Sequence, residues 1–157
     1  MRILIQRVKR AAVSVDGSAV SEIGLGMVFL VGVGDGPTDA EALADKCAHL
    51  RIFEDHAGKM NRSVLEVGGR ILATPQFALY ADTRRGRRPS FVEAAPPGLG
   101  KELFVAFVEY LSGHGLTVES GIFGAHMEVE IHNDGPVTLM IQSPRTRELS
   151  QNPGAIS

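Results

Sequence analysis

The stretch EVEIHNDGPVTLMIQ, residues 128–142, alternates apolar and polar residues at both of its ends. A period of two residues is typical of a β-strand with one buried face. Pro136 interrupts the alternation, and proline donates no hydrogen bond to a neighbouring strand, so it is confined to edges, strand starts and bulges. The simplest prediction is a hairpin of two strands, with Asp134-Gly135-Pro136 in the connection.

Residues 2–33 carry the same kind of pattern. Alternation with β-branched residues predicts strands over residues 2–8 and 11–15, and Asp16-Gly17 is a strong hairpin signal that predicts a partner strand over 19–23. The nearly continuous apolar run over 27–33 is typical of a strand that is buried on both faces. We therefore expect the chain to open with a β-meander.

Two helices are predicted between these strands and residues 128–142. Thr38 and Glu41 form a T-x-x-E capping box, and apolar residues then recur every three or four positions, which predicts a helix over about 38–50 with Cys47 on its buried face. The same spacing over 103–111, followed by glycines, predicts a second helix.

The order of these elements predicts the fold class. Strands before and after two helices, with a short strand over residues 70–73 between them, indicate an α+β fold with a mostly antiparallel sheet. A chain of 157 residues, 44% of them hydrophobic, is long enough for one core. We expect a single domain over residues 1–143, followed by a polar and flexible C-terminal tail over 144–157.

Composition narrows the function classes. The apolar run at the N-terminus is too short for a signal peptide or a membrane span, so we expect a cytoplasmic protein without a membrane partner. A single cysteine permits neither an internal disulfide nor a cysteine zinc cluster. The net charge is −2, so affinity for nucleic acid requires a local basic patch, and RVKR (7–10) and TRRGRRP (83–89) are the two candidates. An arginine run is also common in solvated loops.

Motifs for covalent or cofactor chemistry are absent from the sequence. It contains no G-x-S-x-G elbow, no Walker loop and no dinucleotide fingerprint, so no cofactor is expected. His126 and His132 would face the same side of one strand, which is compatible with a metal-dependent hydrolase. No third ligand accompanies these two histidines at a suitable spacing, and we therefore expect no metal.

Two segments resemble the D-aminoacyl-tRNA deacylase family. They are PQFALYADTRRGRRPSF (75–91), which is similar to the family signature S-Q-F-T-L, and NDGPVT (133–138), which is similar to the signature G-P-V-T. LIQRV, RIFED, GKMN and G-x-F occur in the family's order as well, so the resemblance spans residues 1–142. It implies a barrel-like homodimer that hydrolyses the ester between a D-amino acid, or glycine, and the terminal ribose of tRNA.

The resemblance also implies roles for individual residues. In the family, a cis glycine–proline pair from one subunit enters the active site of the other and excludes L-amino acids, a role that falls to Gly135 and Pro136. A matching arginine, Arg7, holds that segment. Further substrate contacts are implied for Gln76 at the terminal nucleotide, for Phe123 against the adenine, and for Val137 and Thr138. Arg84, Arg85, Arg87 and Arg88 are expected to meet tRNA phosphates, and no DNA partner is expected.

This chain departs from the family signature at Pro75 and Ala78, where the family usually has serine and threonine. One interpretation is a tRNA-binding module that has lost turnover. The other is that the threonine hydroxyl is not needed, because the backbone N–H groups of Phe77 and Ala78 stabilise the oxyanion and the ribose 2′-hydroxyl assists the water. We favour the second interpretation, since any residue except proline supplies a backbone donor.

Overall fold

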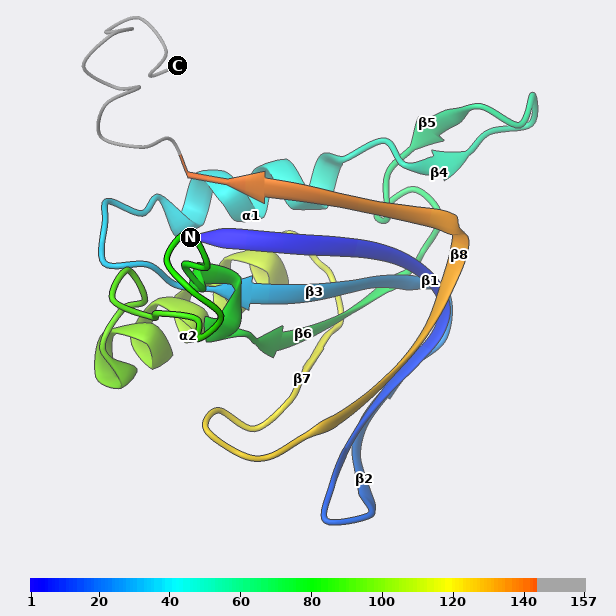
Figure 1. The fold of residues 1–157 in the computed structure, drawn as a ribbon. Helices are drawn as coiled ribbons and strands as arrows, with labels where there is room; N and C mark the ends of the chain where they lie inside the picture. The colour runs from blue at the N-terminus through cyan, green and yellow to red at the C-terminus, as the bar shows by residue number, and fades with distance from the viewer. Residues whose placement is uncertain (144–157) are drawn as a thin grey trace, which may run out of the picture.

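The computed structural model describes residues 1–143, and the tail expected over 144–157 lies outside them. Strands make up most of the regular secondary structure of the described chain, with two α-helices and one short 3-10 helix (Figure 1). In chain order the elements are β1 (Arg2–Val15), β2 (Ser18–Ile23), β3 (Gly26–Gly32), α1 (Ala40–His49), β4 (Phe53–Glu54), β5 (Met60–Arg62), β6 (Arg70–Pro75), η1 (Phe77–Tyr80), α2 (Pro97–Gly113), β7 (Val118–Ser120) and β8 (Glu128–Gln142).

β1 is the centre of the main sheet. One of its edges pairs with β8 along its whole length, from Arg2 to Ser14. The other edge holds two strands end to end, because β3 pairs with residues 2–8 and β2 with residues 11–15. The predicted hairpin at Asp16-Gly17 is confirmed, and both turn residues have positive φ. The predicted meander is wrong, since β3 returns to β1 and does not pair with β2.

The sheet is mixed. The three pairings of β1 are antiparallel, as predicted, but β6 runs parallel to β3 and β7 runs parallel to β6. Parallel neighbours need long crossover connections, and here the connections contain α1 and α2. Figure 1 shows how strongly the sheet curves, so that the architecture is close to a barrel.

β8 differs from the prediction in a way that matters for the site. Residues 128–142 do not form a hairpin: they form one strand, and both of its halves pair with β1. Gln6 is opposite Thr138 and Val8 is opposite Asn133, so the segment 134–137 lies opposite Arg7 alone. This segment is a bulge, which is the other environment in which a strand accommodates proline.

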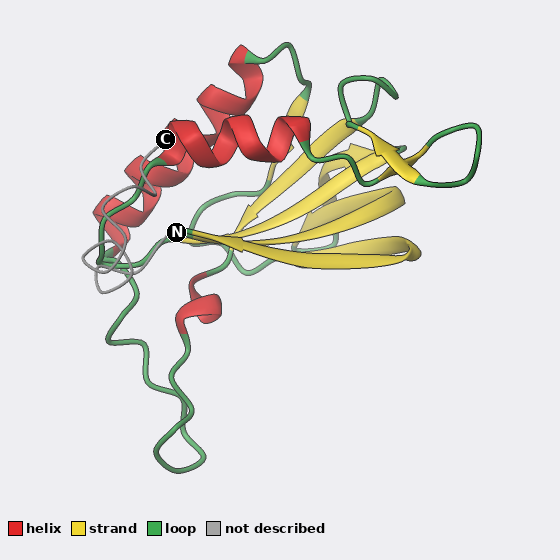
Figure 2. Cartoon of the chain, turned by 90° about the horizontal axis from the view of Figure 1, so that it is seen from above, coloured by secondary structure: helices red, strands yellow, loops and turns green. Residues whose placement is uncertain are grey.

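Both helices cover one face of the sheet (Figure 2). The larger core lies between them and the sheet, and includes Ile3, Ile5, Phe29, Cys47 and Phe107. A smaller cluster on the opposite face contains Val8, Ala11, Val13, Ile23, Val28 and Leu72. No helix within residues 1–143 has both the length and the apolar character that a membrane crossing requires.

The helices begin elsewhere than predicted. The side chain of Asp39, rather than Thr38, caps α1 by accepting a hydrogen bond from the backbone N–H of Ala42 at 2.9 Å, and the predicted capping box is not formed. Cys47 is fully buried, as predicted, and burial raises the pKa of its thiol to about 12. α2 starts at Pro97, where the missing N–H of a proline has no cost.

Candidate functional site

The bulge of β8 presents a glycine–proline pair at the surface. The peptide bond between Gly135 and Pro136 is cis, and both residues are exposed. Gly135 has a φ of +118°, a conformation that side chains disfavour. A Cβ at this position would lie 2.9 Å from Nη2 of Arg7 and 3.0 Å from Cγ2 of Val137. The position therefore requires glycine for both its conformation and its space.

Arg7 fixes the bulge from the neighbouring strand. Its side chain is buried, and its Nε lies 3.2 Å from Oδ2 of Asp134 and 3.3 Å from the carbonyl oxygen of the same residue. Nη1 donates to the carbonyl oxygen of Ile52 at 2.7 Å. A buried guanidinium is stable only when it is paired and hydrogen-bonded, and both conditions hold here. The role implied for Arg7 fits this geometry.

Thr138 and Asn133 close the bulge at its two ends. Oγ1 of Thr138 accepts hydrogen bonds from Gln6 at 3.3 Å and from Asn133 at 3.2 Å. Asn133 also donates to the carbonyl oxygen of Val137 at 3.3 Å, and Val137 packs against the larger core. In this chain Thr138 and Val137 thus support the bulge itself.

A second group of backbone polar atoms lies where β6 ends. The N–H of Gln76 donates to the carbonyl oxygen of Val31 at 2.8 Å, and η1 begins with the next residue. The first N–H groups of a helix have no partner within it. Within residues 1–143, no hydrogen bond engages the N–H of Phe77 or Ala78, and both residues are exposed. These two donors are available to an anionic oxygen.

Side chains around η1 hold this turn in place. Arg2 donates to the carbonyl oxygen of Leu79 at 2.8 Å, and its guanidinium lies 4.4 Å from the ring centroid of Tyr80. Phe77 is 63% exposed and meets Phe91 edge to face, with ring centroids 4.9 Å apart. Two exposed aromatic rings therefore lie beside the free backbone donors.

A buried hydroxyl lies next to this turn in sequence. Thr74 is 1% exposed, and its Oγ1 has no hydrogen-bond partner among the described residues. Oδ1 of Asn133 is also buried and has no hydrogen-bond partner among these residues. Pro75, one of the two departures from the family signature, follows Thr74 as the last residue of β6 and pairs with Val31.

The sequence comparison covers nearly all of the described chain. The family model described as D-Tyr-tRNA(Tyr) deacylase matches residues 4–142. The chain belongs to this deacylase family. The resemblance inferred from its motifs is therefore confirmed, and so is the prediction of an ester-hydrolysing enzyme at the level of the family.

Relatives and solved structures agree with this assignment. A D-aminoacyl-tRNA deacylase from Thermomicrobium roseum is 58% identical over 149 residues, which cover 94% of this chain and 97% of the relative. One from Heliobacterium modesticaldum is 60% identical over 144 residues, 90% and 96% of the two chains. The c-Myc DNA Unwinding Element Binding Protein has a TM-score of 0.86 at 37% identity and covers 92% of this chain and 100% of its own. A probable eukaryotic D-amino acid tRNA deacylase, with a TM-score of 0.79 at 18% identity over 89% and 97% of the chains, shares the fold.

The four arginines of the loop over residues 83–89 differ in whether they form an ion pair within the chain. A bridge between Asp82 and Ser90 closes the loop at its base. Arg84 pairs with Asp82, at 2.6 Å from Nη2 to Oδ2, and its hydrogen bonds lower the pKa of Asp82 to about 2. Arg85, Arg87 and Arg88 are exposed and form no ion pair within residues 1–143. The structure thus separates one internally paired arginine from three that face solvent.

The remaining predicted residues of the deacylase lie in separate places. Phe123 is half-buried near α2, where a Cβ at Gly100 would lie 3.6 Å from its ring. His132 contacts Glu130 at 2.7 Å and Arg10 at 3.0 Å, whereas His126 precedes β8 and is exposed. Among the described residues, these two histidines share no cluster of three metal ligands.

Sequence reasoning missed Asp134, Asn133 and the carbonyl of Ile52 as supports of the bulge. Asp134 carried a usable signal, because an acid directly before Gly135-Pro136 is a natural partner for the arginine assigned to hold that pair. The Ile52 carbonyl carried none, since it reaches Arg7 only through the tertiary fold.

Proposed function

We propose that this chain hydrolyses the ester bond between a D-amino acid and the terminal ribose of tRNA, and that it also releases glycine from mischarged tRNA. The family and the names of the relatives support the reaction class. The structural observation that supports the proposal further is the exposed Gly135-Pro136 bulge, which the buried Arg7 contacts from the neighbouring strand β1.

Stereochemical choice follows from backbone geometry. The two enantiomers of an aminoacyl group carry the same amine and the same side chain, so a site rejects one of them only by blocking the direction of its side chain. A rigid backbone obstructs any side chain, whatever its identity. Gly135 and Pro136 offer such a surface, and glycine on tRNA passes because it has no side chain to obstruct.

Catalysis is assigned to the backbone and to the substrate. Ester hydrolysis needs a stabilised oxyanion, and the unpaired N–H groups of Phe77 and Ala78 supply two donors at the start of η1. The side chain of Ala78 contributes no nucleophile, so the attacking group is water, oriented by the ribose 2′-hydroxyl. Gln76 precedes the two donors and contacts the terminal nucleotide.

We assign the complete site to two copies of the chain. Gly32, opposite Arg2, packs against η1, whereas Arg7 contacts the bulge. Arg7 lies five positions after Arg2 along β1, about 17 Å at about 3.4 Å per residue. Such a separation supports a homodimer in which the Gly135-Pro136 bulge of one subunit meets the Phe77 and Ala78 donors of the other.

Contacts with tRNA complete the proposal. Phe123 stacks on the terminal adenine, where a base on an aromatic ring contributes about 1–3 kcal/mol. Arg85, Arg87 and Arg88 meet phosphates, and Arg84 shapes their loop through Asp82. The protein works in the cytoplasm, where aminoacyl-tRNA is found, and requires no cofactor.

Paired substrates test the proposal. Tyrosyl-tRNA carrying D- or L-tyrosine is incubated with the full chain, and deacylation is followed over time with Gly-tRNA as a third substrate. We expect rapid release of D-tyrosine and glycine and retention of L-tyrosine. Binding of all three without release would favour the non-catalytic tRNA-binding module, and release that stops after exhaustive chelation would favour the metal-dependent hydrolase.

A further inference from the structure

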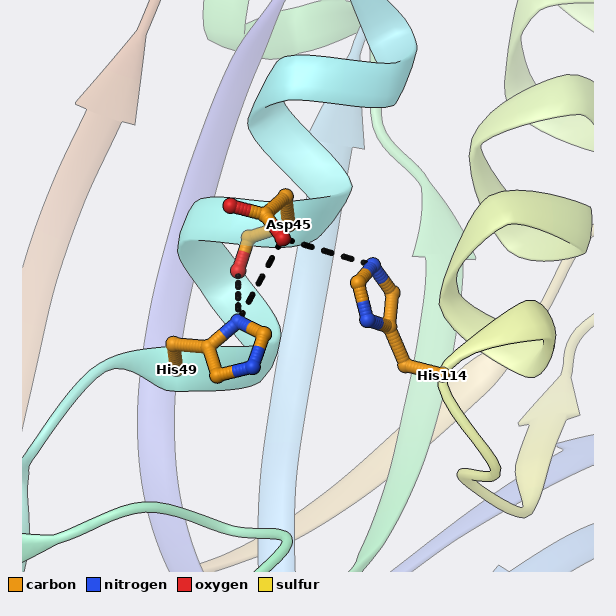
Figure 3. A group of neighbouring side chains, drawn as sticks. All are labelled: Asp45, His49 and His114. Carbon is orange, nitrogen blue, oxygen red and sulfur yellow. Dashed lines mark hydrogen bonds and ion pairs between the residues drawn. The ribbon is translucent and has the colours of Figure 1, made fainter.

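Three metal-ligating side chains converge where α1 meets the end of α2 (Figure 3). Asp45 and His49 lie one turn apart on α1, so their side chains share a face of the helix. His114 is the C-cap residue of α2 and approaches the same point from the neighbouring helix. One ligand atom from each of the three residues lies within 4.8 Å of the other two.

The distances are close to those of a metal site. Oδ1 of Asp45 lies 3.5 Å from Nδ1 of His49 and 3.8 Å from Nε2 of His114. In a tetrahedral site with ligand bonds of about 2.0–2.2 Å, neighbouring ligand atoms are about 3.3 Å apart. All three side chains are at least partly exposed, so small rotations bring the ligands to that spacing.

We infer that Asp45, His49 and His114 bind a divalent transition-metal ion of the zinc class and thereby connect α1 to α2. Two imidazoles and one carboxylate suit zinc, cobalt or nickel, whereas magnesium and calcium prefer oxygen ligands alone. Three protein ligands leave the remaining coordination positions to water. His49 gives up the hydrogen bond from Nδ1 to the Asp45 carbonyl oxygen, now 2.8 Å long, and its ring proton moves to Nε2.

A second histidine–carboxylate pair provides a matched contrast. His132 lies 2.7 Å from Glu130, but the guanidinium of Arg10 bonds the same carboxylate and lies 3.0 Å from the His132 ring. A fixed cation in this position repels a metal ion and occupies the carboxylate. The Glu130–His132 pair therefore binds no metal, although its two residue types match those of the α1 cluster.

The test uses the full chain, stripped of metal, with zinc and cobalt chloride as probes. Calorimetric titration should give one zinc equivalent per chain, and cobalt should produce visible absorption bands. His114→Asn should weaken the affinity at least tenfold, while His132→Asn leaves it unchanged. Zinc at 100 times the dissociation constant of the parent chain should raise Tm by several degrees in the parent chain and in His132→Asn, and by about half as much or less in His114→Asn.

Three outcomes would overturn the inference. They are the absence of saturable zinc binding below millimolar concentration, undiminished binding by His114→Asn, and loss of binding in His132→Asn. To separate lost ligation from lost folding, the metal-free Tm of each variant is measured first. If His114→Asn unfolds, His49→Gln replaces it, since His49 is exposed and lies in the last turn of α1.

Discussion

Arg7 on β1 reaches across to Asp134 on β8 through a single nitrogen, with Nε 3.2 Å from the carboxylate and 3.3 Å from the backbone carbonyl oxygen. The same guanidinium donates to Ile52 in the segment after α1. One buried cation therefore joins β1, β8 and the segment after α1 at the bulge that interrupts the pairing of β8 with β1. We expect the position of Gly135 to depend on this contact.

Replacement of Arg7 should weaken both stability and turnover. Arg7→Ala leaves the 28% exposed side chain of Asp134 without its nearest partner and the carbonyl oxygen of Ile52 without its donor. An unsatisfied buried polar group costs about 1–3 kcal/mol of unfolding free energy, measurable by urea denaturation. Lys9→Ala is the matched control, because the Lys9 side chain is 77% exposed and lies 4.0 Å from the same carboxylate. We expect it to change stability by less than about 1 kcal/mol. Equal effects of the two variants would contradict the role of Arg7.

Substitution of Gly135 tests the bulge directly. Gly135→Ala places a Cβ 2.9 Å from Arg7 and 3.0 Å from Val137 at a φ of +118°. We expect kcat/KM for D-aminoacyl-tRNA to fall at least tenfold and the D/L ratio to decrease. Gly58→Ala is the control, since Gly58 also has positive φ, at +74°, but a Cβ there meets nothing within 4 Å. That variant should lose some stability and keep its D/L ratio; an unchanged ratio in Gly135→Ala would exclude the bulge as the stereochemical filter.

Ala78 tests the source of the chemistry. Because the backbone N–H and not the side chain is assigned to the oxyanion, Ala78→Thr should leave kcat within about tenfold, less than about 1.4 kcal/mol in the barrier. A substrate ending in 2′-deoxyadenosine should react far more slowly than its ribose counterpart with both proteins. A large gain in rate from the threonine would show that the side-chain hydroxyl matters.

The arginine loop should control affinity and leave stereochemistry unchanged. Removal of Arg85, Arg87 and Arg88 together should reduce the slope of log K against log salt by about 0.7–0.9 for each tRNA phosphate that is no longer neutralised. The matched control is the double variant Asp82→Asn and Arg84→Gln, which removes the internal pair without a change in net charge. Its salt slope should equal that of the parent chain, and a larger effect there would place the tRNA contact at Arg84.

Cys47 gives a prediction for alkaline pH. Burial raises the pKa of the thiol from 9.0 to about 12, so the folded chain keeps the proton that the unfolded chain loses above pH 9. The contribution of the protonated thiol to the unfolding free energy is therefore fully present below pH 9 and decreases between pH 9 and 12. In the parent chain, the unfolding free energy should fall more steeply over this range than in Cys47→Ala, by up to about 1.4 kcal/mol per pH unit. Identical slopes would show that the thiol is accessible.

Local patterns predicted most of the elements but not all of their pairings. Alternation identified both ends of β8, yet it looks the same whether two segments pair with each other or with a shared third strand, and the hairpin was wrong for this reason. The parallel neighbours β3 and β6 lie far apart in sequence, and no turn motif connects them. Asp39 caps α1 in place of Thr38, and aspartate is the more favoured of the two residue types at a helix N-cap.

The sequence also predicted only part of the candidate site. Gly135, Pro136 and Arg7 were found because the resemblance gave them roles, and the structure brings Arg7 into contact with the glycine–proline segment. The unpaired donors of Phe77 and Ala78 are consistent with their expected role, but only the three-dimensional structure shows that no other group within residues 1–143 uses them. The paired state of Arg84 also depends on the conformation of its loop.

The irregularity in β8 has a consequence for changes in chain length. Paired residues before Asn133 and after Thr138 anchor the intervening segment at both ends, so a single inserted or deleted residue there would shift one flank by one position and turn its side chains to the opposite surface. The loop from Thr83 to Pro89 has no such constraint at its tip. Libraries that vary the length of this protein should therefore recover functional variants in the arginine loop and almost none between Asn133 and Thr138.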